Sequence, residues 1–332
     1  ELAPDKIKPA ELLDENPVIS PEIMELLNFG SDYYQYPLGQ CFNTALPRYL
    51  RDGEKFAYEQ VPGLKLVENH SYDPSKIRSD EQKLLLRVLE NGPVRRQELR
   101  DRGFSAASEN ALVKKGICTI VDCRTTDRKY TDIKQEELLR ETPPVPNSEQ
   151  ADAILTITSC SHFSTFLLNG VTGSGKTEVY LRVIEHVLRQ GKAALVLVPE
   201  IALTPQTFER FYRRFNISVS SMHSALSDRE RLDAYLDMST KKSGILIGTR
   251  TALFTPIPSL GLIVIDEEHD HSFKQNDKFR YHARTLAIMR AKICDCPIVL
   301  GSATPSLETL YNVKRMLFRE LKLSVRAGGA TP

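Results

Sequence analysis

Two hydrophobic patterns alternate along the second half of the chain, from residue 147 onward. Short apolar runs predict strands over Thr165–Asn169, Ala193–Val198, Val219–Met222, Gly244–Gly248, Leu260–Ile265 and Pro297–Gly301. Between them, apolar residues recur at helical spacing and predict helices over Glu178–Gln190, Pro205–Phe215, Asp228–Met238 and His282–Lys292. This alternation favours an α/β fold with a parallel sheet and helices on both faces, in which ligands bind beyond the carboxyl ends of the strands.

Residues 73–124 have a different pattern. Ser79 is placed to cap a first helix, two more helices are predicted over Val94–Arg102 and Ser105–Lys115, and a strand is predicted over Ile117–Val121. Three short helices and a strand suggest a winged-helix domain whose third helix would enter a DNA groove. The third helix is only weakly basic, so a helical spacer that binds no nucleic acid stays open as the alternative.

The rest of the chain carries less signal. Residues 1–55 are interrupted by prolines and contain one amphipathic helix pattern over Pro21–Tyr36. We interpret this part as the end of a truncated domain, or as an arm that packs on another part of the protein. Residues 56–72 are polar and residues 125–146 are charged and then proline-rich, and both are predicted to be linkers.

Composition narrows the class of protein. The chain has 332 residues, with 44 Lys and Arg against 43 Asp and Glu, so any affinity for nucleic acid must come from local patches. No apolar run approaches the length of a membrane span and no signal peptide is visible, so we expect a cytoplasmic protein without a membrane partner. The six cysteines do not form paired C-x-x-C knuckles, so we expect no zinc site within this chain. Because the chain begins with Glu1 rather than Met, we expect it to be a fragment.

The most specific motif is GVTGSGKT, residues 170–177, which fits the G-x-x-x-x-G-K-[ST] phosphate-binding loop. It follows a predicted strand and precedes a predicted helix, which is the context that such a loop requires. Its backbone N–H groups would hold phosphates at the helix N-terminus, Lys176 would reach the β- and γ-phosphates, and Thr177 would bind Mg²⁺. The expected nucleotide-binding residues are Gly170, Thr172, Gly173, Ser174, Gly175, Lys176 and Thr177. A glycine-rich turn that only joins strand to helix is the alternative.

A second motif, LIVIDEEH over residues 262–269, is an apolar run followed by acids. It has the form of a strand that delivers carboxylates to its carboxyl end. Asp266 is expected to hold Mg²⁺, Glu267 to position and activate the attacking water, and His269 to sense the γ-phosphate. An acidic loop after a core strand is the alternative.

Further motifs also follow predicted strands. In GSATP, residues 301–305, the hydroxyls of Ser302 and Thr304 could bond to the DEEH segment and couple hydrolysis to movement. The segments VPEIALTPQ, residues 198–206, and GTRTAL, residues 248–253, carry small and polar residues. Among these, Thr249 and Arg250 suit contacts to a nucleic-acid backbone.

In this order and spacing, the motifs resemble the first motor lobe of a superfamily 2 helicase. The stretches LLNGVTGSGKTEVYL, VPEIALTPQ, VIDEEHDHSFKQ and FRYHAR are similar almost continuously to the primosomal protein N′ (PriA) family of bacterial replication-restart helicases. The resemblance is strong over 147–332, where it implies a RecA-like lobe. It is moderate over 73–124, where it implies a winged-helix domain. Through SDYYQYPLGQ, residues 17–50 resemble the end of the family's N-terminal DNA-binding domain.

The resemblance implies a function for the whole protein. Members of the family use ATP and Mg²⁺ to unwind DNA with 3′→5′ polarity, recognise stalled forks and initiate primosome assembly. The implied partners are forked and single-stranded DNA, primosomal proteins and single-strand-binding protein, and a monomer is expected. A double-strand DNA translocase and a non-catalytic primosome scaffold are the competing hypotheses.

Two further stretches acquire meaning from the resemblance. Gln150 stands where related helicases read adenine, although Asn147 and Gln150 are also spaced as a capping box. In HSFKQNDKFRYHAR, residues 271–284, aromatic residues alternate with cations, which suits binding to single-stranded DNA. A surface loop stapled by its aromatic residues is the alternative. The DNA-contacting residues expected in this stretch are Phe273, Lys274, Phe279, Arg280, Tyr281 and Arg284.

The chain also departs from the family pattern, because it stops after one more predicted helix and strand. The second motor lobe, with its arginine finger, and the zinc-binding cysteines of the family would lie in a missing part. We therefore expect this chain alone to bind nucleotide weakly, to hydrolyse ATP poorly and not to unwind DNA.

Overall fold

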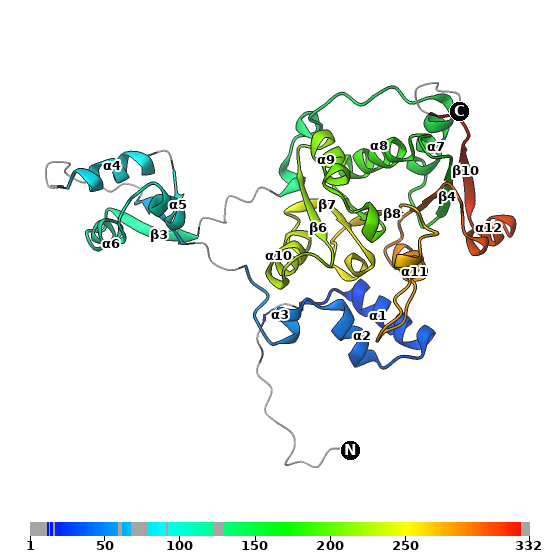
Figure 1. Ribbon diagram of the computed structural model, residues 1–332, viewed down its shortest axis with the longest axis horizontal. Helices are drawn as coiled ribbons and strands as arrows, with labels where there is room; N and C mark the ends of the chain where they lie inside the picture. Colours follow the sequence, from blue (N-terminus) through cyan, green and yellow to red (C-terminus); the bar gives the residue numbers. More distant parts are fainter. Residues whose placement is uncertain are drawn as a thin grey trace, which may run out of the picture. The chain divides into compact units, whose positions relative to one another are not determined.

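The computed structural model describes residues 12, 14, 15, 17–58, 62–67, 77, 79–90, 92–122 and 129–326 (Figure 1). It divides into two compact units, one formed by residues 1–57 and 128–332 and the other by residues 58–127. Each unit has a hydrophobic core of its own.

The larger unit is built on a sheet of seven parallel strands. Their order across the sheet is β10-β4-β9-β8-β5-β7-β6. The strands are β4 Thr165–Gly170, β5 Ala193–Leu197, β6 Ser218–Met222, β7 Ser243–Gly248, β8 Leu260–Ile265, β9 Ile298–Ser302 and β10 Arg319–Leu323. The predicted parallel α/β sheet is confirmed, and each predicted strand lies within a residue or so of its observed bounds.

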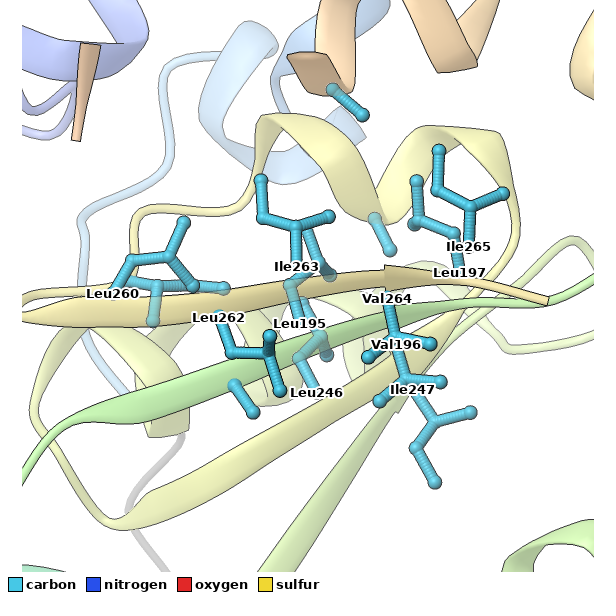
Figure 2. Close-up of a cluster of buried hydrophobic side chains, with 14 of the residues drawn as sticks. Leu195, Val196, Leu197, Leu246, Ile247, Leu260, Leu262, Ile263, Val264 and Ile265 are labelled. Atoms are coloured by element: carbon cyan, nitrogen blue, oxygen red, sulfur yellow. The ribbon is translucent and has the colours of Figure 1, made fainter. Parts of the chain in front are cut away.

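The central strands are buried along their whole length. In β5, β7 and β8 every residue is buried, because helices cover both faces of the sheet. Figure 2 shows their branched side chains packed in layers, with Leu195, Ile247 and Ile263 among them. This core holds the carboxyl ends of the strands in fixed positions, and the motifs follow those ends.

Helices lie on both sides of this sheet (Figure 1). Helix α8 packs on β5 and β8, with α7 beside it, whereas α10 packs on β6 and β7 and α11 packs on β8 and β9. The helices are α7 Ser148–Thr158, α8 Lys176–Arg189, α9 Pro205–Arg214, α10 Asp228–Ser239, α11 Ala283–Ile293 and α12 Leu307–Lys314. Short 3₁₀ turns are η3 Tyr130–Asp132, η4 Gln135–Glu137, η5 Glu200–Ala202, η6 Arg250–Phe254 and η7 His271–Phe273.

The N-terminal segment belongs to the larger unit. It forms α1 Pro21–Tyr34, α2 Leu38–Ala45 and α3 Arg48–Arg51, of which only the first was predicted. Helix α1 packs on α11 and α3 packs on α10. Ile23, Leu26 and Leu27 are buried in the core that also contains the parallel sheet. The described part of the segment therefore packs on the lobe, as one of the two interpretations of its sequence expected. The other interpretation, the end of a truncated domain, is compatible with this packing and stays a prediction.

The smaller unit combines three helices with a three-stranded antiparallel sheet of order β2-β1-β3. Its elements are β1 Pro62–Leu66, α4 Asp80–Leu89, β2 Val94–Arg95, α5 Arg96–Asp101, α6 Ala106–Lys114 and β3 Cys118–Asp122. Leu64, Leu85 and Leu112 are fully buried in its core. These elements agree with the three helices and the strand expected here, and the name winged helix stays a prediction.

Two predicted boundaries are wrong. Strand β1 lies inside residues 56–72, which were predicted to be a linker, and Val94–Arg95 is a strand rather than the start of a helix. Strand β2 has only two residues and β1 begins with Pro62-Gly63, so neither shows a strand pattern, and both are stabilised by pairing with each other and, for β1, with β3.

The second predicted linker, residues 125–146, is also more than a linker where the structure describes it. From Lys129 onward it follows the surface of the larger unit. The hydroxyl of Tyr130, a buried residue, donates to the carbonyl of Gly191 at 3.1 Å, and Leu139 forms a bridge with Phe215. These contacts fix the segment on the larger unit through a few apolar residues. The many charged residues around them are the reason why the sequence predicted a linker.

Among the described residues, no helix is long and apolar enough to cross a membrane. In the same part of the chain, no three His, Cys, Asp or Glu side chains are grouped so that they could hold a metal ion.

Candidate nucleotide-binding site

The phosphate loop joins β4 to α8. Gly173 and Gly175 have φ of +81° and +82°, a conformation that residues with a side chain rarely adopt. A Cβ on Gly170 would lie 2.5 Å from Ser174 Oγ, so this position also requires glycine. Helix α8, which has 14 residues, begins at Lys176, so the loop lies at the N-terminus of this helix. The loop therefore has the backbone geometry of an anion site.

Lys176 lies at the floor of this site. Its ammonium group is nearly buried and donates to the carbonyl of Gly170 at 2.9 Å. It also lies 3.7 Å from Glu267 Oε1. The charge of Lys176 is thus held between the loop and the acidic segment that follows β8.

The acids of the DEEH segment converge on the loop. The amide of Asp266 donates to Leu197 at the end of β5, which fixes the backbone. The hydroxyl of Tyr180, on α8, donates to Asp266 Oδ1 at 3.0 Å. Burial and the neighbouring charge of Glu267 raise the pKa of Asp266. Burial, and then Asp266, raise the pKa of Tyr180 well above its usual value, so Tyr180 keeps its proton and remains the donor.

Glu267 has an unusual backbone conformation. Its φ is +46°, in the left-handed region that non-glycine residues seldom occupy. The residue lies at the turn where the chain leaves β8, and its carboxylate oxygens lie 3.7 Å from Lys176 Nζ and 3.7 Å from His269 Nδ1. The turn therefore presents this carboxylate beside the phosphate loop.

His269 connects the acids to the GSATP segment after β9. Its Nδ1 lies 2.8 Å from Ser302 Oγ, and its Nε2 lies 3.3 Å from Thr304 Oγ1. The amide of Thr304 donates to Ser302 Oγ, which closes the network. The structure thus brings together Lys176, Asp266, Glu267, His269, Ser302 and Thr304, all selected from the sequence.

The chain matches a family model described as DEAD/DEAH box helicase over residues 147–313, which is more than half of its length. The chain belongs to the DEAD/DEAH box helicase family. A second model, described as a PriA 3′ DNA-binding domain, matches residues 1–47.

Curated relatives of the chain show which helicases of this family it resembles. The chain is 39% identical over 338 residues to "Replication restart protein PriA" of Haemophilus influenzae, covering 98% of this chain and 45% of that protein. It is 43% identical to the protein of the same name from Bacillus subtilis, covering 67% of this chain and 28% of that protein. The chain thus resembles PriA but spans less than half the length of these relatives. Among solved structures, the Hef helicase domain of Pyrococcus furiosus covers 58% of this chain and 40% of its own, at 20% identity and a TM-score of 0.45.

The helicase lobe offers a matching place for ATP and Mg²⁺. Ser174 Oγ is buried and has no hydrogen-bond partner among the described residues, and it lies within the phosphate loop. Thr172 is exposed at the loop, and Thr177 is partly exposed on the first turn of α8, with its hydroxyl 3.5 Å from Arg210 Nη1. A magnesium nucleotide requires hydrogen-bond donors for its phosphates and oxygen ligands for Mg²⁺. The loop amides and Lys176 are such donors, and the Thr177 hydroxyl and the Asp266 carboxylate are such ligands.

Gln150 is engaged within the protein. Asn147 and Gln150 form a capping box at the start of α7, and Gln150 Nε2 also donates to the carbonyl of Ser174 at 2.9 Å. Both polar atoms of the nearly buried side chain are therefore used. The capping box, which the sequence left as the alternative, is therefore present, and Gln150 also contacts the phosphate loop through Ser174. The adenine contact of Gln150 stays a prediction.

The aromatic residues of segment 271–284 do not form a stacking platform. Phe273, Phe279 and Tyr281 are buried, so the expectation that these rings stack on bases is wrong for this structure. Phe279 packs on Tyr36 and Tyr34 of the N-terminal segment, with ring centroids 5.6 and 5.9 Å apart. The stapled-loop alternative is the one that the structure shows.

The cations of the same segment divide into two groups. Lys274 and Arg280 are exposed, and their DNA contact stays a prediction. Arg284 instead pairs with Glu268, a fully buried carboxylate that also accepts from the Ser306 amide at 2.7 Å and the Thr309 hydroxyl at 3.0 Å. Its predicted DNA contact is not supported, because this guanidinium compensates a buried charge.

Of the two residues after β7, Thr249 is nearly buried. Arg250 donates to Gln275 Oε1 at 2.6 Å and to the carbonyl of Ser272 at 2.8 Å. Arg250 thus links the strand end to the aromatic segment.

Two residues of this helicase site were missed from the sequence, Tyr180 and Glu268. Tyr180 lies one helical turn after Lys176, and that spacing was the signal available.

Proposed function

We propose that this chain is the ATP-binding part of a DNA helicase that unwinds DNA with 3′→5′ polarity at stalled replication forks and initiates primosome assembly. The observation that carries the proposal is the convergence of three strand ends. The phosphate loop after β4, the acids after β8 and the hydroxyls after β9 meet around Lys176 and Glu267. The similarity to PriA supports the replication-restart role.

Each residue of the site has a role in this proposal. Lys176 and the loop amides bind the β- and γ-phosphates, and Thr177 and Asp266 hold Mg²⁺. Bound Mg²⁺ would neutralise charge on the phosphate oxygens. Tyr180 occupies one oxygen of Asp266, so it orients the other. Glu267 positions water, since its carboxylate is held by Lys176 on one side and faces His269 on the other.

Movement would be coupled to hydrolysis through His269. Its imidazole bonds to Ser302 and Thr304, which lie at the end of β9 just before α12. A change in the contacts of Glu267 would reach β9 through this network. Ser302 and Thr304 therefore act as coupling residues.

Several partners belong to the proposal for the whole protein. The match of residues 1–47 to a 3′ DNA-binding domain supports forked and single-stranded DNA as ligands, and the smaller unit would add a winged helix. Primosomal proteins and single-strand-binding protein would be partners, the protein would be monomeric and cytoplasmic, and zinc would be bound outside this chain. The exposed cations Lys274 and Arg280, together with the partly exposed Arg250, would contact DNA, whereas Thr249 would first have to become accessible.

The test measures ATP turnover of the full-length protein with forked, single-stranded and blunt duplex DNA. We expect the highest turnover with forks. Preference for blunt duplex would favour a double-strand translocase, and no turnover with any DNA would favour a non-catalytic scaffold.

Substitutions test the assignments in the same assay. Lys176→Ala should lose nucleotide affinity, whereas Glu267→Gln should bind nucleotide and lose turnover by about 10²-fold or more. Lys314→Ala, on the exposed side of α12, is the matched control and should behave like the natural protein. Normal turnover in Glu267→Gln would overturn the assignment of this residue.

A further inference from the structure

Glu268 is a buried carboxylate in the DEEH segment, and the roles proposed above do not use it. Its side chain is 0% exposed, whereas that of the preceding Glu267 is 37% exposed. Glu267 lies beside Lys176 of the phosphate loop, and Glu268 lies beside Ser306 on the other side of the turn. A buried carboxylate is costly unless donors surround it, so its donors are the groups that hold the turn in place.

Donor groups from two helices surround this carboxylate. The Ser306 amide donates to Glu268 Oε1 at 2.7 Å, and the hydroxyls of Ser306 and Thr309 donate to Oε2 at 3.1 and 3.0 Å. Arg284, in the first turn of α11, pairs with Oε2 and also donates to Thr309 Oγ1 at 3.3 Å. Ser306 is the N-cap of α12, and Thr309 is buried in the first turn of that helix. The carboxylate therefore ties the turn after β8 to the start of α11 and the start of α12.

The backbone of this turn is held on both sides of Glu267. Before it, the amide of Asp266 donates to the carbonyl of Leu197 at 2.9 Å, and after it, the amide of Glu268 donates to the carbonyl of Gly301 at 3.0 Å. The φ of Glu267, +46°, is unfavourable and persists only where the surrounding contacts hold it. The side-chain contacts of Glu268 add to that hold on the carboxyl-terminal side of the turn.

We propose that Thr309 and Arg284 are positioning residues for ATP hydrolysis, which act through Glu268 to hold Glu267 beside the phosphate loop. Neither residue belongs to the phosphate loop, to DEEH or to GSATP. Within the described part of the chain, their side chains contact the residues around Glu268 and none of the phosphate loop. Their loss should leave nucleotide binding intact and displace the carboxylate that positions water. The inference rests on the proposed role of Glu267 and adds the residues that fix its place.

The main test is Thr309→Val in the full-length protein, with turnover measured at saturating forked DNA over a range of ATP concentrations. Valine has the shape of threonine without the hydroxyl, so Glu268 loses one donor. A hydrogen bond to a charged group contributes about tenfold or more to an equilibrium constant, so kcat should fall by about tenfold. The KM for ATP and the affinity for a fluorescent ADP should not change. Thr309→Ser keeps the hydroxyl and should retain the natural kcat.

Glu268→Gln tests the carboxylate itself. Glutamine keeps the length of the side chain but loses the charge, and its amide group would face the donors of Arg284 and Thr309. Displacement of a reacting group by about 1 Å can cost about 10²-fold, so kcat should fall by about that factor with ADP affinity unchanged. Glu308→Gln is the matched control, because Glu308 is the other carboxylate near Arg284, at 3.8 Å, and is 74% exposed. It should keep the natural kcat.

Two further variants separate position from stability. Met238→Ala removes a buried side chain at the end of α10, just before the amino end of β7 and therefore far from the site. It should lower the thermal midpoint and leave kcat unchanged at temperatures well below that midpoint. Thr309→Val combined with Glu267→Gln should be no slower than Glu267→Gln alone, because displacing a disabled group costs nothing more.

Four outcomes would overturn the inference. They are an unchanged kcat in Thr309→Val, a loss of ADP affinity that parallels the loss of kcat, a loss of kcat in Met238→Ala as large as in Thr309→Val, and losses of kcat that multiply in the combined variant. Each of these, with turnover still lost in Glu267→Gln, would leave the proposed function standing. Normal turnover in Glu267→Gln would instead refute the proposed role of Glu267, and this inference with it.

Discussion

Among single residues, Tyr180 makes the most consequential contact in the candidate site. Its hydroxyl reaches Asp266 across the end of β9, where Gly301 stands. A Cβ on Gly301 would lie 1.6 Å from Tyr180 Oη and 2.8 Å from its Cζ. The glycine of GSATP is therefore explained by the path of the tyrosine side chain, which connects α8, β8 and β9 at one point.

This contact predicts a coupled pair of substitutions. Gly301→Ala should destabilise the larger unit by more than about 1–3 kcal/mol, since the new methyl group meets a fixed ring. Tyr180→Phe removes the hydroxyl and should cost about 1–3 kcal/mol by leaving Asp266 without its buried partner. In the double variant the alanine methyl group has more room, because the tyrosine hydroxyl is gone. The loss of unfolding free energy in the double variant should therefore be smaller than the sum of the losses in the two single variants.

Urea denaturation measures the coupling, and titration with fluorescent ADP at several Mg²⁺ concentrations measures the effect on the site. Tyr180→Phe alone should shift the Mg²⁺ dependence of ADP binding, because Asp266 is no longer oriented. Additive losses of stability would show that the tyrosine is not the reason for the glycine.

Residue patterns predicted the phosphate and acid motifs well and the aromatic segment poorly. The spacing of GVTGSGKT and DEEH is set by local backbone geometry, so it is visible in the sequence. The sequence pattern around Phe279, an aromatic residue between two cations, is the same whether the ring stacks on DNA or is buried in a core. Its partners, Tyr34 and Tyr36, are distant in the chain, and no local pattern reports that contact.

At the scale of elements, helix α1 meets the aromatic segment through a glycine. A Cβ on Gly30 would lie 2.9 Å from Cζ of Phe279, whose ring is enclosed by Tyr34, Tyr36 and Tyr281. The absence of a side chain lets the helix approach the ring closely. The position of the 271–284 segment therefore depends on α1.

Substitutions of two helical glycines should have opposite signs. Gly30→Ala gains up to about 1 kcal/mol of helix propensity but must displace α1 or the ring, at a cost of about 1–3 kcal/mol, so we expect a net loss. Gly39→Ala in α2 meets nothing within 4 Å and should stabilise by about 0.4–1 kcal/mol. Denaturation midpoints measure both, and a stabilised Gly30→Ala variant would contradict the close packing.

Elements were predictable where periodicity was strong and long. The inner strands β5, β7 and β8 carry long apolar runs because both of their faces are buried, and the helices between strands show clear helical periodicity. Strand β1 has two buried residues and begins with Pro62-Gly63, so no pattern marks it. The segment from Lys129 to residue 146 appeared to be a linker because only a few anchors, such as Tyr130 and Leu138, are apolar and buried.

The two hydrophobic cores are the main feature of the whole molecule. One contains the parallel sheet and the N-terminal helices, and the other contains β1 and α4 to α6. Separate cores allow separate cooperative transitions. The sequence predicted three domains, over residues 1–55, 73–124 and 147–332, whereas the chain divides into two compact units, of which the larger includes the N-terminal segment.

We expect two unfolding transitions in calorimetry. Leu85→Ala should lower only the transition of the smaller unit, and Leu246→Ala only that of the larger one, because each side chain is fully buried in its own core. Each substitution should cost about 2–5 kcal/mol. A single transition that responds to both substitutions would show that the two cores unfold together.

The chain enters and leaves the smaller unit from the same body, with Phe56 packed on Tyr235 before it and Tyr130 bonded to Gly191 after it. In topological terms the smaller unit is an insertion, held by two tethers instead of one. Cleavage of one connection would leave the smaller unit covalently attached to the larger unit through the other. Because the smaller unit has a hydrophobic core of its own, its removal would leave the core of the larger unit intact.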